Sequence, residues 1–196
     1  MDTLQDLFED MLKDMYFAEK ALLKAMPKMA KAAHSEELRI CMTGHLEETK
    51  KHVVRIEEIF KLLDQKPVAK ECPAMKGLLE EAESLMEEVP ASPLLDAGMA
   101  AHGRAVEHYE MARYAILHEW ATTLGQDEVA TLIGLSLDEE ETFEEMLADL
   151  ATEMLNPEAN GQTDEEDDME QPSAVAAKSV KQSSSKGSKA TKSKSG

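Results

Sequence analysis

Four long stretches of the chain place apolar side chains at every third or fourth position, the spacing that gives a helix one apolar face. They cover residues 2–33, 35–63, 93–123 and 127–156, and each is about 30 residues long. Helices of that length measure on the order of 45 Å and can bury such a stripe only against partners of similar length. The periodicity therefore predicts an all-α protein, and an aromatic content of only 4 % is also untypical of sheets.

Residues that favour helix ends separate the four stretches. Ser92 and Pro93 suit the cap and the first position of a helix. We expect Pro27 to kink the first helix and the pair Asn156-Pro157 to end the last one. A residue that can cap a helix stands at the start of every stretch: Asp2, Ser35, Ser92 and Asp127.

The connections between the stretches predict how the helices are joined. Short turns follow the first and third helices, whereas about 28 residues separate the second from the third, including a short amphipathic segment near residues 76–89. Short turns make neighbouring helices antiparallel, and a crossover of that length can run the whole length of a bundle. The sequence therefore predicts a ferritin-like four-helix bundle with one long crossover between helices 2 and 3.

The last part of the chain has a different composition. Residues 161–196 contain no aromatic residue and form an acidic block followed by a Lys/Ser-rich segment, so we expect a disordered tail after a bundle of residues 1–160. The last 19 residues carry six lysines and no acids, a composition that can bind the DNA backbone. A tether to the acidic residues 164–170 or to the bundle, or simple solubility, is the alternative role.

Charge and cysteine content restrict the partners of the bundle. The net charge of −19 belongs entirely to residues 1–160, because the tail holds six acids and six lysines. Such a body repels nucleic acid and anionic membranes and attracts cations. Cys41 and Cys72 form no CxxC motif, the N-terminus has acids where a signal peptide needs lysines, and no apolar run approaches 18 residues. We therefore expect a cytoplasmic protein without a membrane segment.

Ionisable side chains interrupt all four apolar stripes near the middle of each helix. Because antiparallel helices of equal length align their midpoints, these side chains are expected to meet at one level of the core. Six buried carboxylates would be too costly unless they are protonated or neutralised by cations, and two divalent metal ions would supply the missing charge. The predicted metal ligands are Glu19, His45, Glu48, His52, Glu107, Glu110, Glu140 and Glu144.

An alternative reading applies to each of these residues alone. A single Glu on an apolar stripe is usually a boundary residue that reaches water or pairs with Lys. The coincidence on four helices favours a metal centre instead, and its excess of oxygen over nitrogen donors favours iron or manganese over copper or zinc. Tyr16 and Tyr114 lie within one turn of Glu19 and Glu110; we expect core packing for both, with a hydrogen bond to a ligand carboxylate as the alternative.

The two histidines of the second helix are seven residues apart, or about 10 Å along its axis. The metals of a two-metal site lie only about 4 Å apart, so we expect only one of the two histidines to be a ligand. Because Cα–Cβ bonds tilt toward the helix N-terminus, His52 leans toward Glu48 and is the preferred ligand. His45 is then expected to support the site from outside.

The stretches YFAEKALLKAMPKMAKAA, GHLEETKKHVVRIEEIF, AVEHYEMARY and LDEEE resemble the YciE/YciF-type ferritin-like family of bacterial stress proteins over about residues 4–155. The resemblance implies a four-helix bundle, a homodimer and a di-iron or di-manganese carboxylate site, without a settled reaction. Ferritin-like sites commonly draw a Glu-x-x-His motif from each of two helices. This chain has His45-x-x-Glu48 and Glu107-x-x-Glu110 instead, and no His in its last helix.

These observations leave three functions open. The first is a stress-protective redox protein that binds two iron or manganese ions and acts on Fe²⁺, O₂ or peroxide as an oxidase or peroxidase. The second is a non-catalytic protein in which the metal ions hold the bundle together. The third is a nucleoid-associated protein that binds DNA through its Lys-rich tail.

Overall fold

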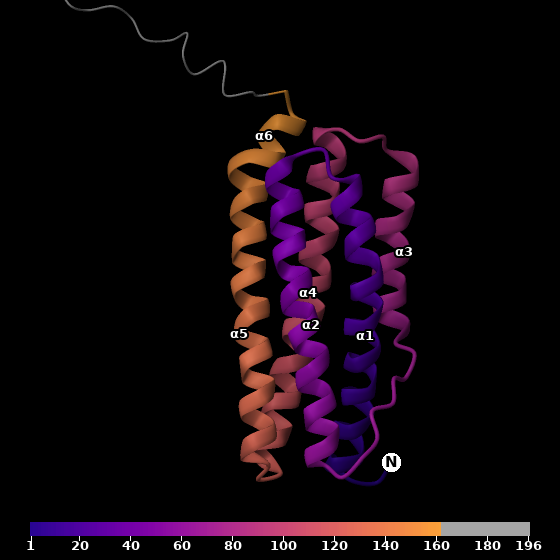
Figure 1. Cartoon of the computed structure of the whole chain (residues 1–196), viewed down its shortest axis with the longest axis vertical. Coiled ribbons are helices and arrows are strands. Elements are labelled where there is room, and N and C mark those ends of the chain that lie inside the picture. The colour runs from indigo at the N-terminus through magenta and orange to yellow at the C-terminus, as the bar shows by residue number, and fades with distance from the viewer. Residues whose placement is uncertain (162–196) are drawn as a thin grey trace, which may run out of the picture. The chain divides into compact units, whose positions relative to one another are not determined.

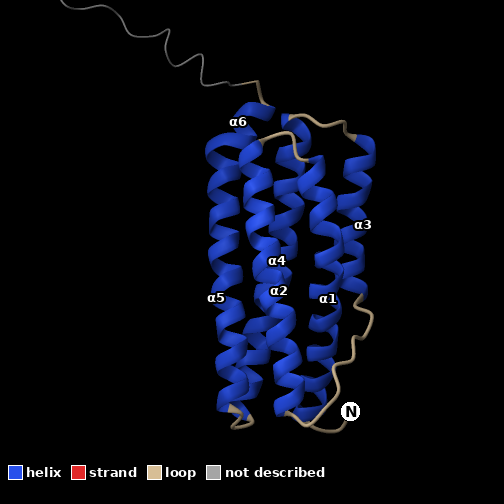
Figure 2. Ribbon diagram, in the orientation of Figure 1, coloured by secondary structure: helices blue, strands red, loops and turns tan. Residues whose placement is uncertain are grey.

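The computed structural model describes residues 1–161, and this part of the chain contains helices and short connections but no strand (Figure 2). A π-helical turn, Ala151–Leu155, follows the last long helix and leads into the short α6, Asn156–Ala159. The predicted Lys-rich tail lies outside the described residues. The five longer helices are α1 Leu4–Ala32, α2 Glu36–Leu62, α3 Pro73–Glu88, α4 Pro93–Thr123 and α5 Asp127–Leu150.

Helices α1, α2, α4 and α5 form a four-helix bundle, and α3 lies outside it within the crossover (Figure 1). The α1–α2 hairpin packs against the α4–α5 hairpin through α2 with α5 and α1 with α4, and α3 covers the side formed by α1 and α4. This arrangement confirms the predicted ferritin-like bundle with its single long crossover. No helix among residues 1–161 combines the length and the apolar composition needed to cross a membrane.

Two of the four predicted caps are confirmed and two are wrong. The hydroxyls of Ser35 and Ser92 accept backbone N–H groups of α2 and α4. Thr3, not Asp2, caps α1, because Thr3 and Asp6 exchange two hydrogen bonds and satisfy each other's backbone N–H. Asp127 is the first residue of α5 rather than its cap, a position where its charge favours the helix dipole.

Two further boundaries differ from the prediction. The short helix of the crossover begins at Pro73, because the Cys72 sulfur accepts the N–H of Met75 and proline suits the first helical position. The last helix does not end at Pro157, since the π-helical turn allows the chain to continue to Ala159.

A buried carboxylate holds the two hairpins in register. Asp96, near the start of α4, is 0 % exposed and accepts the backbone N–H groups of His34 and Ser35 at 2.8 and 2.6 Å. These two residues form the turn between α1 and α2. The contact therefore fixes the start of α2 beside the start of α4 and aligns the midpoints of the helices.

The apolar core is divided along the length of the bundle. One cluster includes Phe8, Phe60 and Ile133, and another includes Met29, Met99 and Leu147. Each cluster draws residues from α1, α2, α4 and α5, so the four helices are in close contact on both sides of their midpoints. The ionisable stripe residues lie between the two clusters.

Candidate metal centre

The structure buries seven of the eight side chains that the sequence predicts as ligands. Glu19 comes from α1, His45 and His52 from α2, Glu107 and Glu110 from α4, and Glu140 and Glu144 from α5; none of these seven residues is more than 8 % exposed. Side chains from all four helices of the bundle are thus withdrawn from water near its middle.

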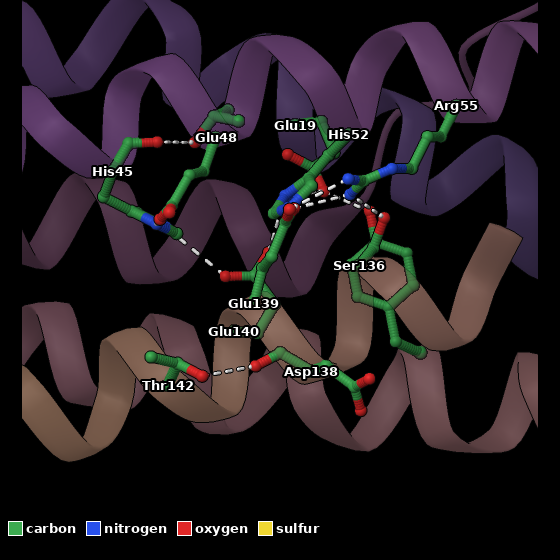
Figure 3. A network of polar contacts seen from close by, with 12 residues as sticks. Glu19, His45, Glu48, His52, Arg55, Ser136, Asp138, Glu139, Glu140 and Thr142 are labelled. Atoms are coloured by element: carbon green, nitrogen blue, oxygen red, sulfur yellow. Dashed lines mark hydrogen bonds and ion pairs between the residues drawn. The ribbon is translucent and has the colours of Figure 1, made fainter.

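Glu140 stands between the two histidines, as Figure 3 shows. One of its oxygens, Oε1, lies 3.0 Å from His52 Nδ1, and the other, Oε2, lies 3.4 Å from His45 Nε2. Glu19 Oε1 is 3.4 Å from the same His52 nitrogen, and Glu107 Oε1 is 3.6 Å from the same His45 nitrogen. Two groups of two carboxylates and one imidazole therefore share Glu140, and the potential ligand atoms of each lie within 4.8 Å of one another.

The second nitrogen of each imidazole is held by another carboxylate. His52 Nε2 donates to Glu139 at 2.8 Å, and the Arg55 guanidinium donates two hydrogen bonds to the same carboxylate (Figure 3). His45 Nδ1 donates to Glu48 at 3.3 Å. A proton on the outer nitrogen leaves a lone pair on the inner nitrogen, which is the arrangement that orients metal-binding histidines.

The polar atoms at this level lack hydrogen-bond partners. Within residues 1–161, ten buried side-chain oxygen and nitrogen atoms have no partner, and eight of them belong to this cluster. Buried polar atoms in folded proteins are nearly always paired, so eight together need an explanation. Carboxylate oxygens and imidazole nitrogens are all metal-binding atoms, and these groups can hold a metal ion. The eight atoms are Glu19 Oε2, His45 Nε2, His52 Nδ1, Glu107 Oε2 and both carboxylate oxygens of Glu110 and of Glu140.

Burial also changes the proton affinities. Loss of water raises the pKa of Glu19, Glu107 and Glu110, and the charge of Glu140 raises all three further. Burial lowers the pKa of His45. Burial alone would also lower the pKa of His52, but the Glu140 and Glu19 carboxylates beside its Nδ1 outweigh burial and raise this pKa to about 10. Without metal, the cluster therefore retains protons that a divalent cation could replace.

Three predicted ligands, Glu48, Glu110 and Glu144, are not part of either group; Glu110 is buried, and neither of its oxygens has a hydrogen-bond partner. The Glu48 side chain is 35 % exposed, so the expectation of six buried carboxylates is wrong at this position. Between the two histidines, the side chain that faces the core is that of Thr49, which is 1 % exposed. Because Glu48 is the preceding residue, it lies on the flank of α2. Glu144 is buried but pairs with Arg104 Nε at 2.7 Å and His108 Nε2 at 3.4 Å.

The structure adds residues that the sequence analysis missed. Glu139 accepts a hydrogen bond from His52, and Arg55 holds Glu139 in turn. The signals available in the sequence were the adjacent acids of LDEEE and the one-turn spacing from His52 to Arg55. The Tyr114 hydroxyl donates a hydrogen bond to Glu19. For Tyr114, the alternative to simple core packing, a hydrogen bond to a predicted ligand carboxylate, is therefore present. Tyr16 instead donates to Glu57 at 2.6 Å.

Comparison with known proteins identifies the family. Residues 3–160 match a family described as a domain of unknown function, DUF892. The chain is 36 % identical to protein YciF of Escherichia coli over 160 residues, which cover 81 % of this chain and 96 % of YciF. The crystal structure of this stress protein matches with 37 % identity and a TM-score of 0.76, over 80 % of this chain and 99 % of YciF.

A second solved structure is that of YcfI from Rhodopseudomonas palustris, whose description proposes a structural role. It is 41 % identical, covers 75 % of this chain and 94 % of its own, and gives a TM-score of 0.73. With the fold and the sequence in agreement, the chain belongs to the YciF-type, DUF892 family of ferritin-like bacterial stress proteins.

Proposed function

We propose that the buried cluster binds two divalent metal ions, iron or manganese, and that the protein is a stress-protective redox protein. The observation that carries this proposal is the placement of Glu140, whose two oxygens face two different imidazoles. In the proposed centre, His52 and Glu19 would hold one ion, His45 and Glu107 would hold the other, and Glu140 would serve both positions. The predominance of oxygen donors favours iron or manganese.

The remaining residues support this centre in different ways. Glu110 is a further ligand, because both of its oxygens are buried without a partner. Glu139 and Glu48 orient the two imidazoles from outside. Tyr114 holds the Glu19 carboxylate through its hydroxyl group. For Glu48 and Glu144, a direct ligand role stays a prediction that their observed contacts do not favour.

If these residues hold two Fe²⁺ ions, the ions would supply two electrons, enough with two protons to reduce O₂ to hydrogen peroxide or hydrogen peroxide to two molecules of water. The chain itself provides buried carboxylates that can hold those protons and apolar clusters that exclude bulk water. Both contributions suit a metal-dependent oxidase or peroxidase.

The test is metal analysis of the full-length protein purified without chelators, followed by optical spectra after Fe²⁺ and then O₂ or peroxide are added. We expect two ions per chain and a spectral change that follows oxidation. Glu140→Gln should lose both ions, because it removes the shared carboxylate, whereas the exposed neighbour Glu141→Gln should keep both. A metal-free protein, or a Glu140→Gln variant with two ions, would contradict the proposal.

A non-catalytic structural role for the metal is the second candidate. The proposed ligands come from all four bundle helices, so bound ions would cross-link α1, α2, α4 and α5. The role proposed in the description of YcfI is compatible with this function. Two tightly bound ions that react with neither O₂ nor peroxide would favour it over the redox function.

A further inference from the structure

An apolar cavity of about 30 Å³ adjoins one side of the candidate centre. Its polar lining residues are His45 and Glu107, the pair that we assign to one of the two metal positions, and the half-buried His102 of α4. All five long helices contribute to its walls, and α3 contributes Leu79 and Ala82 from outside the bundle. The apolar lining includes Met26, Met42, Leu79, Ala82, Val106 and Phe143.

The walls next to the histidine are held by packing. The Phe143 ring stacks on the His45 ring with centroids 3.7 Å apart and planes 2° from parallel. Gly103 contributes no side chain on the α4 wall, and a Cβ atom there would lie only 2.9 Å from Leu147 Cδ2. The cavity is therefore bounded by fixed aromatic and aliphatic groups rather than by exposed loops.

The size and the lining of the cavity restrict its occupant. One water needs roughly 10–15 Å³ on this measure, and sites for organic ligands span about 300–1,000 Å³, so the cavity fits a molecule of a few atoms. Apolar cavities stay dry and bind apolar guests. Away from His45, His102 and Glu107, hydrogen peroxide would bury its hydroxyl groups against apolar walls, at a cost of about 1–3 kcal/mol for each unpaired group.

We propose that the cavity is a binding site for molecular oxygen beside the His45 and Glu107 position. In this proposal, the small molecule that the cavity binds is O₂, not peroxide or an organic molecule. The use of the bound O₂ in a reaction rests on the proposed metal function, whereas the binding of O₂ is a property of the metal-free chain. The two statements can therefore fail separately.

Methionine methyl groups make the binding measurable by NMR. O₂ is paramagnetic and speeds the relaxation of nuclei beside it, so we expect the methyl signals of Met26, Met29 and Met42 to relax faster under O₂ than under argon in the full-length, chelator-treated protein. Met15 and Met75 are matched controls, because both are 0 % exposed and neither lines the cavity. The effect at the cavity should be about threefold larger or more, since a close-packed interior excludes guests elsewhere.

Variants of α3 test whether the cavity is responsible. Ala82→Val adds two methyl groups to the wall and should abolish the extra relaxation, while Ala74→Val on the exposed face of α3 should leave it unchanged. Leu79→Ala enlarges the cavity and should increase the effect, which keeps the test informative if Ala82→Val fails to fold. Equal relaxation of cavity and control methyl groups in the unmodified chain would overturn the proposal, as would a water contact at the Met42 methyl.

The same variants separate this inference from the proposed function. Fe²⁺ binding should be unchanged in Ala82→Val, while the rate at which the Fe²⁺-loaded protein consumes O₂ should fall severalfold. If the chain binds no metal but the methyl groups still report O₂, the metal proposal fails and the cavity stands. If metal binds and reacts with O₂ while Ala82→Val leaves both relaxation and rate unchanged, the cavity assignment fails alone.

Discussion

Replacing Glu110 by Gln should stabilise the metal-free protein relative to the unmodified chain, and the gain should grow with pH. Glu110 is 0 % exposed, neither of its oxygens has a hydrogen-bond partner, and burial raises its pKa well above 4.5. The metal-free folded protein therefore holds a proton on this carboxyl group up to a higher pH than the unfolded chain does. Gln has nearly the same shape and is neutral at every pH.

The magnitude follows from the unfolded chain. There the carboxyl group has its ordinary pKa of 4.5, so keeping it protonated in the folded protein costs up to about 3.4 kcal/mol at pH 7 and up to about 0.8 kcal/mol at pH 5. The sign is that of a group with a raised pKa: the folded state binds more protons than the unfolded state, so stability falls as pH rises above 4.5. The difference in unfolding free energy between the variant and the unmodified protein should thus change by up to about 2.6 kcal/mol from pH 5 to pH 7.

Urea unfolding followed by the helical circular dichroism signal, in the presence of a chelator, measures this difference. With an m-value of about 2 kcal/mol/M, the gap between the two unfolding midpoints should be roughly 1 M larger at pH 7 than at pH 5. Comparing two pH values removes any constant effect of the amide on packing. Glu119→Gln, an exposed change on the same helix, should show no such dependence. A gap of the same size at both pH values would refute the reasoning, because Glu110 would then be ionised in the folded, metal-free protein.

Three other predictions concern the metal and the tail. Chelation should lower the melting temperature at pH 7, and acidification to pH 5 should recover part of the loss by relieving the protonation cost at Glu19, Glu107 and Glu110; scanning calorimetry measures both. In metal titrations, His52→Ala should weaken one of the two positions more than His45→Ala does, because Arg55 and Glu139 hold His52 more firmly; the reverse order would contradict this. Deleting residues 161–196 should leave helicity and metal binding intact but remove any DNA band shift, which in the full chain should disappear by about 200 mM salt.

The periodicity of the sequence was sufficient to predict the bundle, because long apolar stripes with caps at Ser35 and Ser92 specify both the helices and their partners. Local competition between nearby polar residues was harder to foresee. Asp2 and Thr3 are both good caps, and only the reciprocal bonds between Thr3 and Asp6 select the second. At the candidate centre, Glu48 and Thr49 both fit a spacing of three or four, and the rotation of α2 against its neighbours decides which of them faces the core.

The two histidines show most clearly what spacing along a helix leaves out. Their backbones are separated by about 10 Å along the helix axis, which favours only one ligand if each side chain lies at the level of its own backbone. In the folded protein the ring centroids are only 6.3 Å apart. The two rings also present different atoms to Glu140, His45 its distant Nε2 and His52 its nearer Nδ1. A carboxylate on the other ring nitrogen fixes the orientation of each imidazole: Glu48 for His45 and Glu139 for His52. Side-chain conformation, fixed by partners on other turns and another helix, thus brings together two groups that axial spacing alone keeps apart.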